Sequence, residues 1–276
     1  MMAALRILWD VARYRLARLE MANLVAAGAI IVALRTPWLE ASARLAFGVL
    51  LNLLVYLNND FHDAEEDLRA ASKDAVKTRF LYEHRGAAIG AQVALTAMLA
   101  VFAAVYDLGL LVPLLAGGGI CWAYSAVLKR HPVVDVLAMV VWGAVMPAVA
   151  FAPDAWLGWA LVGPLALFSG AFESVQVLRD APEDREAGIR TTGVVLGEAR
   201  NWWLVRFFVV AGAVYGVACI HAQFGWLPLL ALLLPRTQPE RYWNLLRMVL
   251  GIAFLGACAQ VFFTGGTAGL WLKLGG

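Results

Sequence analysis

Charged residues are scarce in this chain: they make up 15% of its 276 residues, while 62% are hydrophobic. The stretches 86–105, 108–128 and 207–220 contain no Asp, Glu, Lys or Arg at all. This composition is far too apolar for a single soluble core, which excludes an ordinary soluble protein. Because about 20 apolar residues span the hydrocarbon layer as a helix, the sequence predicts a polytopic membrane protein.

Cysteine is also rare, and no low-complexity linker divides the chain. Cys121, Cys219 and Cys258 have no paired spacing, so neither a disulfide framework nor a zinc site is indicated. Without a linker, residues 1–276 are predicted to form a single transmembrane domain. The formal net charge of +2 does not suggest nucleic acid as a partner.

The apolar stretches predict an all-α bundle of nine transmembrane helices. The eighth is too short to cross alone and could instead be a re-entrant or tilted segment. The predicted spans are 16–34, 41–58, 86–106, 108–128, 133–152, 156–178, 203–221, 223–235 and 243–264.

The positions of Lys and Arg predict the orientation. If the N-terminus is cytoplasmic, 19 of the 22 Lys and Arg lie on the inner side, and only Arg35, Arg44 and Lys273 lie outside. This asymmetry is typical of a multi-pass protein in a cell inner membrane with its N-terminus inside. The residues before the first span form either an amphipathic segment on the inner leaflet or a simple extension of the first helix.

Two acidic motifs follow apolar spans on the predicted cytoplasmic side. In the first, Asn59, Asp63 and Asp67 are spaced i, i+4 and i+8, and in the second Asp180 and Asp184 are spaced i, i+4. On a helix each set can present its oxygen atoms on one face. Clustered carboxylates repel one another unless hard cations such as Mg²⁺ lie between them and a polyanion. The motifs therefore predict that a diphosphate binds at the membrane surface.

Polar residues inside the spans are further candidates. Glu173 lies within an apolar span, seven residues before Asp180, and an ionisable group at that depth indicates function. Asn52 and Tyr56 share a helix face with Asn59, which predicts either a cavity lining or helix-to-helix hydrogen bonds. Glu65, Glu66 and Glu183 point elsewhere on their helices and are expected to be solvated.

Four segments in order carry a family resemblance. The first motif reads N-D-x-x-D-x-x-x-D from Asn59 to Asp67, and the second reads D-x-x-x-D from Asp180 to Asp184. Between them lies a Tyr-Ser…Lys segment, Tyr124 to Lys129, and Arg185 to Thr192 follows the second motif. Together they resemble the UbiA superfamily of intramembrane prenyltransferases. The resemblance extends over essentially the whole chain.

The resemblance implies a helical bundle around a central, lipid-open cavity with a cap on the cytoplasmic side. It implies Mg²⁺-dependent transfer of a prenyl group from a polyprenyl diphosphate to an aromatic or other small acceptor. Tyr124 and Glu173 would act beside the acids: Tyr124 would steady the leaving group or face the cation, and Glu173 would bind the acceptor, act as a base or complete the metal shell. The implied metal ligands are Asn59, Asp60, Asp63, Asp67, Asp180 and Asp184, with Asp60 either a ligand or an orienting residue, and the implied diphosphate clamps are Lys77, Arg79, Lys129 and Arg190.

The chain departs from the family pattern at three places. Pro182 lies inside the second motif, where it is expected to kink or restart the helix. Val177 stands where many relatives have another acid or amide. Residues 77–80 keep the charges of the family's Lys-Pro-x-Arg-Pro segment but not its prolines.

Other functions remain open from the sequence. A terpene cyclase would use the same ionisation but let the cation close on itself, and a ribosyl-transferring relative would move phosphoribose to a polyprenyl phosphate. A cation-coupled transporter is disfavoured because transporters place their acids near the bilayer midplane, whereas the two acidic motifs here are peripheral. The oligomeric state, the donor chain length and the acceptor are not encoded in any pattern we recognise.

Overall fold

A computed structural model describes residues 2–17, 21–69, 75–236 and 238–275. These residues contain helices and turns but no strand, apart from two isolated β-bridges that involve the C-terminal segment. The predicted all-helical class is therefore confirmed. The α-helices are α1 (Met2–Ala17), α2 (Ala22–Ala33), α3 (Trp38–Arg69), α4 (Ala75–Glu83), α5 (Arg85–Tyr106), α6 (Gly118–Ala126), α7 (Val134–Val145), α8 (Trp156–Glu186), α9 (Thr192–Tyr215) and α10 (Pro239–Thr264).

Short 3₁₀ and π segments join or extend these helices. Two of them begin at a proline, which supplies no backbone N–H and so fits the first turn of a helical segment. They are η1 (Leu108–Leu110), η2 (Pro113–Gly117), η3 (Leu128–Arg130), η4 (Pro147–Ala150), η5 (Gly216–Ile220) and η6 (Leu227–Leu233).

The predicted count of nine spans is not confirmed. Within the part of the chain that the structure describes, six segments are long and apolar enough to cross a membrane, or seven if α1 and α2 count as one bent span. The predicted span 16–34 is divided between α1 and α2, and 133–152 is divided into α7 and η4, where Pro147 starts a new turn. The predicted span 223–235 contains only η6, whose 7 residues rise about 14 Å. That length is too short to cross the hydrocarbon layer alone, in keeping with the re-entrant or tilted segment that the sequence allowed.

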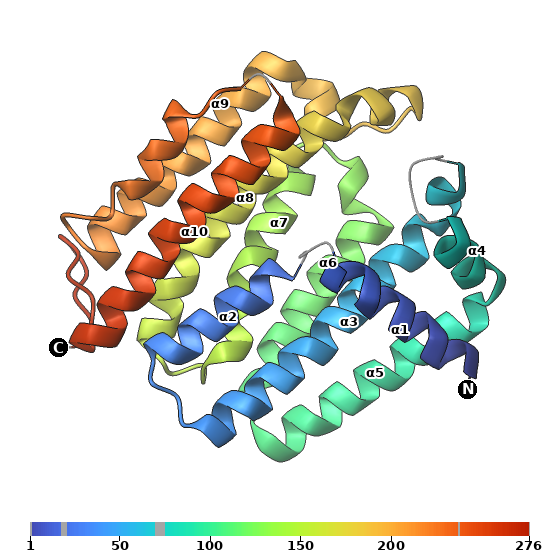
Figure 1. The fold of residues 1–276 in the computed structure, drawn as a ribbon, viewed down its shortest axis with the longest axis horizontal. Helices are drawn as coiled ribbons and strands as arrows, with labels where there is room; N and C mark the ends of the chain where they lie inside the picture. Colours follow the sequence, from blue (N-terminus) through green and yellow to red (C-terminus); the bar gives the residue numbers. More distant parts are fainter. Residues whose placement is uncertain (1, 18–20, 70–74, 237, 276) are drawn as a thin grey trace.

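The helices close into a ring (Figure 1). α2 packs against α3 on one side and α10 on the other, and the ring continues from α3 through α6, α7 and α8 back to α10. α5 lies outside α3, and α9 lies outside α8. Small residues allow the closest approaches: a Cβ on Gly143 of α7 would lie 2.5 Å from the Ser169 side chain of α8.

A small apolar cluster, separate from the main core of the bundle, supports the first acidic motif. Ile7 and Val11 of α1 pack with Leu57 and Ala64 of α3, and Leu81 of α4 completes the contact. All five side chains are almost fully buried. This packing fixes α1 and α4 beside the end of α3 that carries Asn59 to Asp67.

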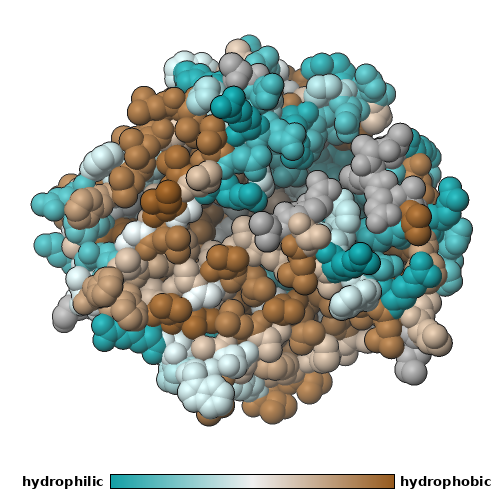
Figure 2. All heavy atoms as spheres, viewed as in Figure 1, coloured by the Kyte–Doolittle hydropathy of each residue, from teal (hydrophilic) through white to brown (hydrophobic). Residues whose placement is uncertain are grey.

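The two ends of the ring differ in polarity. α3 and α8 both end at the upper right in Figure 1, so the two acidic motifs lie at one end of the molecule. Figure 2 shows polar side chains gathered over that region and apolar ones across the middle of this face. At the opposite end Arg44, only 3% exposed, binds Glu40 at 2.8 Å and Asp107 at 2.6 Å. Those three residues join the start of α3 to the turn after α5.

Candidate active site

α3 continues as a helix to Arg69, so the first acidic motif keeps helical spacing. The side-chain amide of Asn59 donates to Asp63 Oδ2 at 2.9 Å. These two residues therefore share a face, as their i, i+4 spacing predicted.

Asp60 faces a different direction and is held by two cations. Arg15 of α1 donates to Asp60 Oδ1 at 2.5 Å, and Lys77 of α4 donates to Asp60 Oδ2 at 2.7 Å. All three side chains are largely buried. The Arg15 guanidinium also lies over the ring of Tyr56, 4.6 Å from its centre, and contacts Asn59 Oδ1 at 3.3 Å. Asp60 therefore anchors α1 and α4 against α3.

Lys129 links the first motif to the connection between α6 and α7. Its ammonium group donates to Asp63 Oδ1 and to Glu66 Oε2, the latter at 3.2 Å. Arg130 donates to Glu66 Oε1 at 2.5 Å. The expectation that Glu66 is solvated is wrong, because its carboxylate bridges two consecutive cations from another part of the chain. Glu65, its neighbour, is exposed and pairs only locally with Arg69.

The second motif lies on the last two turns of α8. The helix continues through Pro182 to Glu186, so the expectation that this proline interrupts it is wrong. Pro182 removes one donor only four residues before the end, and it is exposed, so its ring lies away from the bundle core. Arg179 donates to both oxygens of Asp180, at 2.7 and 3.1 Å.

The chain reverses directly after the second motif. Gly188 has a φ of 72°, and the N–H groups of Gly188 and Ile189 bond the carbonyls of Arg185 and Asp184. This is the Schellman pattern, which needs glycine in the left-handed conformation. The reversal lets the Thr191 hydroxyl donate to Asp184 Oδ2 at 2.9 Å. The reversal therefore fixes the carboxylate of Asp184 through a residue that follows its own motif.

A polar pair lies deeper in the bundle. The Tyr124 hydroxyl donates to Glu173 Oε1 at 2.7 Å, and Glu173 is 5% exposed. The residue chosen for its depth and the one chosen for the Tyr-Ser…Lys segment are therefore direct partners.

The remaining predicted residues lie in three settings. Asn52 is 2% exposed, donates to the Gly48 carbonyl at 2.8 Å and accepts from Asn23 at 2.9 Å, which favours helix-to-helix hydrogen bonding. Arg79 and Arg190 are exposed. Asp67 is partly buried on α3.

The carboxylates do not form a closed metal cage on their own. Among the described residues, no group of three or more His, Cys, Asp or Glu side chains is close enough to hold a metal ion. Instead Asp60, Asp63 and Asp180 are each paired with Lys or Arg. Metal binding by the predicted ligands stays a prediction.

Four residues of this region escaped sequence reasoning: Arg15, Glu66, Asp135 and Thr191. Arg15 is indistinguishable from the basic residues that flank any first membrane helix. Glu66 lies among other acids, and its partners come from 63 residues along the chain. Asp135 was the one with a usable signal, because it is an acid at the start of an apolar stretch.

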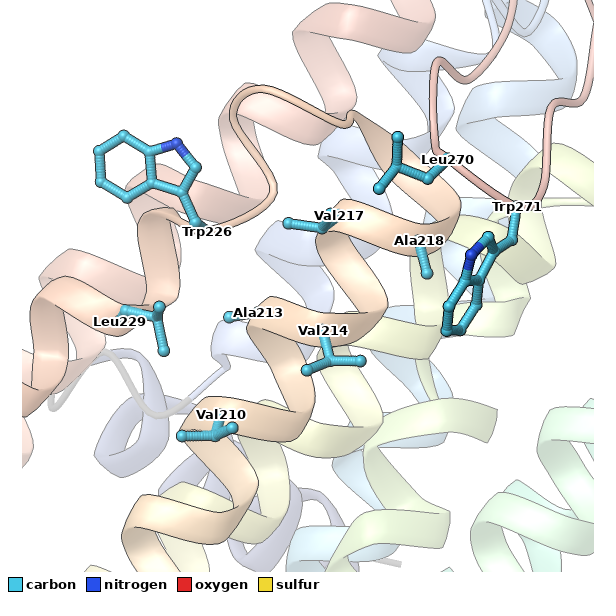
Figure 3. Close-up of a pocket in the computed structure, with 9 residues that line it drawn as sticks. All are labelled: Val210, Ala213, Val214, Val217, Ala218, Trp226, Leu229, Leu270 and Trp271. Atoms are coloured by element: carbon cyan, nitrogen blue, oxygen red, sulfur yellow. The ribbon is translucent and has the colours of Figure 1, made fainter.

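Two apolar cavities lie away from these residues, towards the opposite end. One, of about 240 Å³, is bordered by α9 and the C-terminal segment, with Val214, Trp226 and Trp271 among its lining residues (Figure 3). The other, of about 300 Å³, lies between α8, α9 and α10 beside Phe168, Gly212 and Phe254. Neither includes a residue of the acidic motifs.

Comparison with known proteins agrees with this arrangement. The sequence model of the UbiA prenyltransferase family matches residues 22–248, and the chain belongs to that family. The protein is therefore a membrane prenyltransferase by family. No curated protein matches the chain significantly.

Solved structures show the same fold. A digeranylgeranylglyceryl phosphate synthase is 15% identical, with a TM-score of 0.71 over 94% of this chain and 99% of that one. A UbiA homologue from Archaeoglobus fulgidus bound to DMAPP and Mg²⁺ is 15% identical, with a TM-score of 0.66 over 94% and 99%. The same homologue bound to GPP and Mg²⁺ gives 16% identity and a TM-score of 0.60 over 95% and 99%.

Proposed function

We propose that the protein transfers a prenyl group from a polyprenyl diphosphate to an aromatic or other small acceptor, with Mg²⁺ as cofactor. The main support is that both acidic motifs lie at one end of the molecule, where Lys129 binds Asp63 and Glu66 of the first motif. A largely buried cation beside such carboxylates is arranged to meet a polyanion. The prenyl diphosphates and Mg²⁺ bound by the Archaeoglobus homologue support the same substrate class.

The donor atoms fit magnesium. Carboxylate and carboxamide oxygens are the protein ligands that Mg²⁺ accepts, and the two motifs supply both kinds. When bound, Mg²⁺ neutralises the negative charge that develops on the departing diphosphate. Because Asp60 already holds Arg15 and Lys77, its orienting role is favoured over direct ligation. The proposed ligands are Asn59, Asp63, Asp67, Asp180 and Asp184.

The basic residues bind the leaving group in this proposal. Lys77, Arg79, Lys129 and Arg190 donate hydrogen bonds to the diphosphate oxygens. Lys129 exchanges Asp63 for a diphosphate oxygen when the substrate enters. The allylic C–O bond then breaks, and its electron pair goes to the diphosphate.

The interior pair serves the acceptor. The acceptor forms a new bond to the prenyl carbon and loses a proton, which the Glu173 carboxylate takes up. Tyr124 orients this carboxylate through the 2.7 Å hydrogen bond to Oε1, and its ring faces the positive charge of the prenyl group. On the adjoining face of α3, Tyr56 borders the substrate, while Asn52 holds α2 against α3 through its hydrogen bond with Asn23.

We also propose the setting of this reaction. Residues 1–276 act as one domain in a cell inner membrane, with membrane lipid around the ring and the N-terminus and active site on the cytoplasmic side. The distribution of Lys and Arg supports this orientation.

The test is a product analysis by mass spectrometry. The purified protein in lipid nanodiscs is incubated with Mg²⁺ and farnesyl or geranylgeranyl diphosphate, first alone and then with a panel of phenolic and other small acceptors. An alkylated acceptor that requires Mg²⁺ supports the proposal. A hydrocarbon or terpene alcohol formed without acceptor indicates cyclisation, and a product only from phosphoribosyl diphosphate and a polyprenyl phosphate indicates ribosyl transfer.

Two variants make this test specific. Asp63→Ala and Asp184→Ala should lower kcat/KM by about 100-fold or more, because each removes an oxygen from the proposed metal site. Asp154→Ala is the matched control, since Asp154 is an exposed aspartate at the opposite end. Equal activity in all three variants would remove the acidic motifs from the mechanism.

A further inference from the structure

Asp135 is a buried carboxylate that touches the starts of two helices. It lies in the first turn of α7 and is 1% exposed. Its Oδ1 accepts from the Val136 N–H at 2.8 Å and from the Thr192 hydroxyl, and its Oδ2 accepts from the Thr192 N–H at 2.7 Å. Thr192 is the first residue of α9. One carboxylate therefore joins the N-termini of α7 and α9.

Burying a carboxylate is costly unless its charge is compensated. Among the described residues, the hydrogen-bond partners of Asp135 are N–H and O–H groups of Val136 and Thr192. Both backbone donors belong to first turns, where the helix dipole presents partial positive charge. Two such termini stabilise a buried anion, so the carboxylate fixes how α7 and α9 begin relative to each other.

The same contact extends to the connection that carries Lys129. Val133, between η3 and α7, donates its N–H to the Thr192 hydroxyl oxygen at 2.5 Å. Its φ is 71°, a left-handed conformation that is strained for a β-branched residue. Such a conformation persists only where the surroundings hold it, and the Asp135–Thr192 pair lies directly against it.

The contact also extends to the second acidic motif. Thr191, next to Thr192, donates its hydroxyl to Asp184. The approach of α9 to α8 is tight here, because a Cβ on Gly193 would overlap the Val177 carbonyl oxygen. Thr192 therefore has little freedom to move without moving Thr191.

We propose that Asp135 is a positioning residue for the active site. Through Thr192 and Val133 it sets the two connections that carry Lys129 and Thr191, so that Lys129 faces Asp63 while Thr191 holds Asp184. This inference rests on the proposed function, in which Lys129 binds the diphosphate and Asp63 and Asp184 bind Mg²⁺. Asp135 acts on these residues only through Thr192 and Val133.

The first experiment needs no substrate. Hydrogen exchange is measured on the nanodisc-embedded protein with Asp135→Asn, which keeps the size but removes the charge, and with Thr192→Val, which removes only the hydroxyl. Exchange in residues 127–133 and 187–192 should become faster by about tenfold in both variants. Thr192→Ser keeps the hydroxyl and should restore the protection of the original chain. Unchanged exchange in both connections overturns the proposal whether or not the protein is a prenyltransferase.

The second experiment measures binding and turnover in the same variants. The KM for geranylgeranyl diphosphate and the Mg²⁺ concentration at half-maximal rate should each rise by about tenfold, with a smaller change in kcat. Asp107→Asn is the control, because Asp107 also accepts a backbone N–H, from Gly109 at 2.8 Å, but at the opposite end. It should lower the melting temperature and leave KM unchanged.

The outcomes separate the two proposals. A lower melting temperature in Asp135→Asn with unchanged KM and Mg²⁺ dependence would make Asp135 a purely structural residue and overturn its positioning role. If the original chain binds no inorganic pyrophosphate with Mg²⁺ and turns over no prenyl diphosphate, the proposed function fails and the positioning role fails with it. In that case, faster hydrogen exchange in Asp135→Asn and Thr192→Val would still show that Asp135 holds residues 127–133 and 187–192 in place.

Discussion

Lys129 illustrates how a single side chain can serve two purposes. As a basic residue on the predicted inner side, it satisfies the positive-inside pattern without any substrate. Its side chain is nevertheless only 16% exposed, and its ammonium group contacts Asp63 and Glu66, which is unusual for a residue that only orients a membrane protein. These specific partners support the proposed role of Lys129 in binding the diphosphate.

Lys129→Met tests that role. The variant keeps most of the side-chain length but loses the charge, so the KM for the prenyl diphosphate should rise by about tenfold or more, since a hydrogen bond to a charged group contributes about 1.5–3 kcal/mol. Steady-state kinetics in nanodiscs measure this. Lys273→Met, an exposed lysine near the C-terminus, is the matched control and should leave KM unchanged. A normal KM in Lys129→Met would assign the lysine to topology alone.

Glu66 and Glu65 offer a comparison between neighbours of identical chemistry. Glu66 holds Lys129 and Arg130, whereas Glu65 pairs with Arg69 on the surface. Glu66→Gln should raise the donor KM by about three- to tenfold, because Lys129 loses one of its two anionic partners. Glu65→Gln should have no measurable effect. Equal KM values for the two variants would show that Lys129 needs no support from Glu66.

At the scale of single residues, the sequence predicted the contacts between side chains that are close together on one helix. The pairing of Asn59 with Asp63 follows directly from an i, i+4 step on one helix. The partners of Asp60 and Glu66 come from residues 17 to 64 positions away, and no periodicity indicates which cation meets which acid. Tyr124 and Glu173 were chosen for separate reasons, and only the fold brings them into contact.

Helices in this protein are set by packing more than by local propensity. Pro164 and Pro182 both lie inside α8, yet the helix continues through each of them. α8 packs against α7, α9 and α10, so its conformation is held from several sides. The sequence shows the proline but not the neighbouring helices, which is why Pro182 was expected to kink or restart the helix.

The contact between α7 and α8 depends on the absence of one methyl group. Gly143→Ala would place a Cβ 2.5 Å from the Ser169 side chain and 2.7 Å from the Leu165 carbonyl oxygen. Overpacking of this kind costs about 1–3 kcal/mol, so the melting temperature of the nanodisc-embedded protein should fall. Gly251→Ala in α10 is the control, because its Cβ would meet nothing within 4 Å. An unchanged melting temperature for Gly143→Ala would mean that α7 can shift without cost.

The apolar pattern predicted where helices lie better than how many cross the membrane. The long, uninterrupted stretches 86–106 and 243–264 correspond closely to α5 and α10. Stretches that contain Pro147 or end at Pro235 give shorter segments, whereas Pro164 and Pro182 leave α8 continuous. An apolar stretch can lie in lipid whether or not its helix is continuous, so the apolar pattern alone does not count the crossings.

In the whole molecule, the two acidic motifs lie at one end of the ring, and arginine side chains that join separate segments lie at the other. The acidic motifs, Lys129 and the α1–α4 contacts lie together, while Arg44 with Asp107 and Arg35 with the Phe262 carbonyl close the opposite end. Arg35 and Arg44 are two of the three basic residues that lie outside in the predicted orientation. Both are used in contacts between helices, which explains why these charges are tolerated on that side.

The orientation of this ring in the membrane can be measured directly. In a chain whose three cysteines are replaced by Ala, Glu65→Cys marks the acidic end and Asp154→Cys marks the other end; both positions are exposed. Because the predicted orientation assigns 19 of the 22 Lys and Arg to the inner side, a membrane-impermeant maleimide applied to intact cells should label only the Asp154 position. Both should react after permeabilisation, which controls for reactivity. Labelling of Glu65→Cys alone in intact cells would place the acidic motifs outside, where a diphosphate made in the cytoplasm could not reach them.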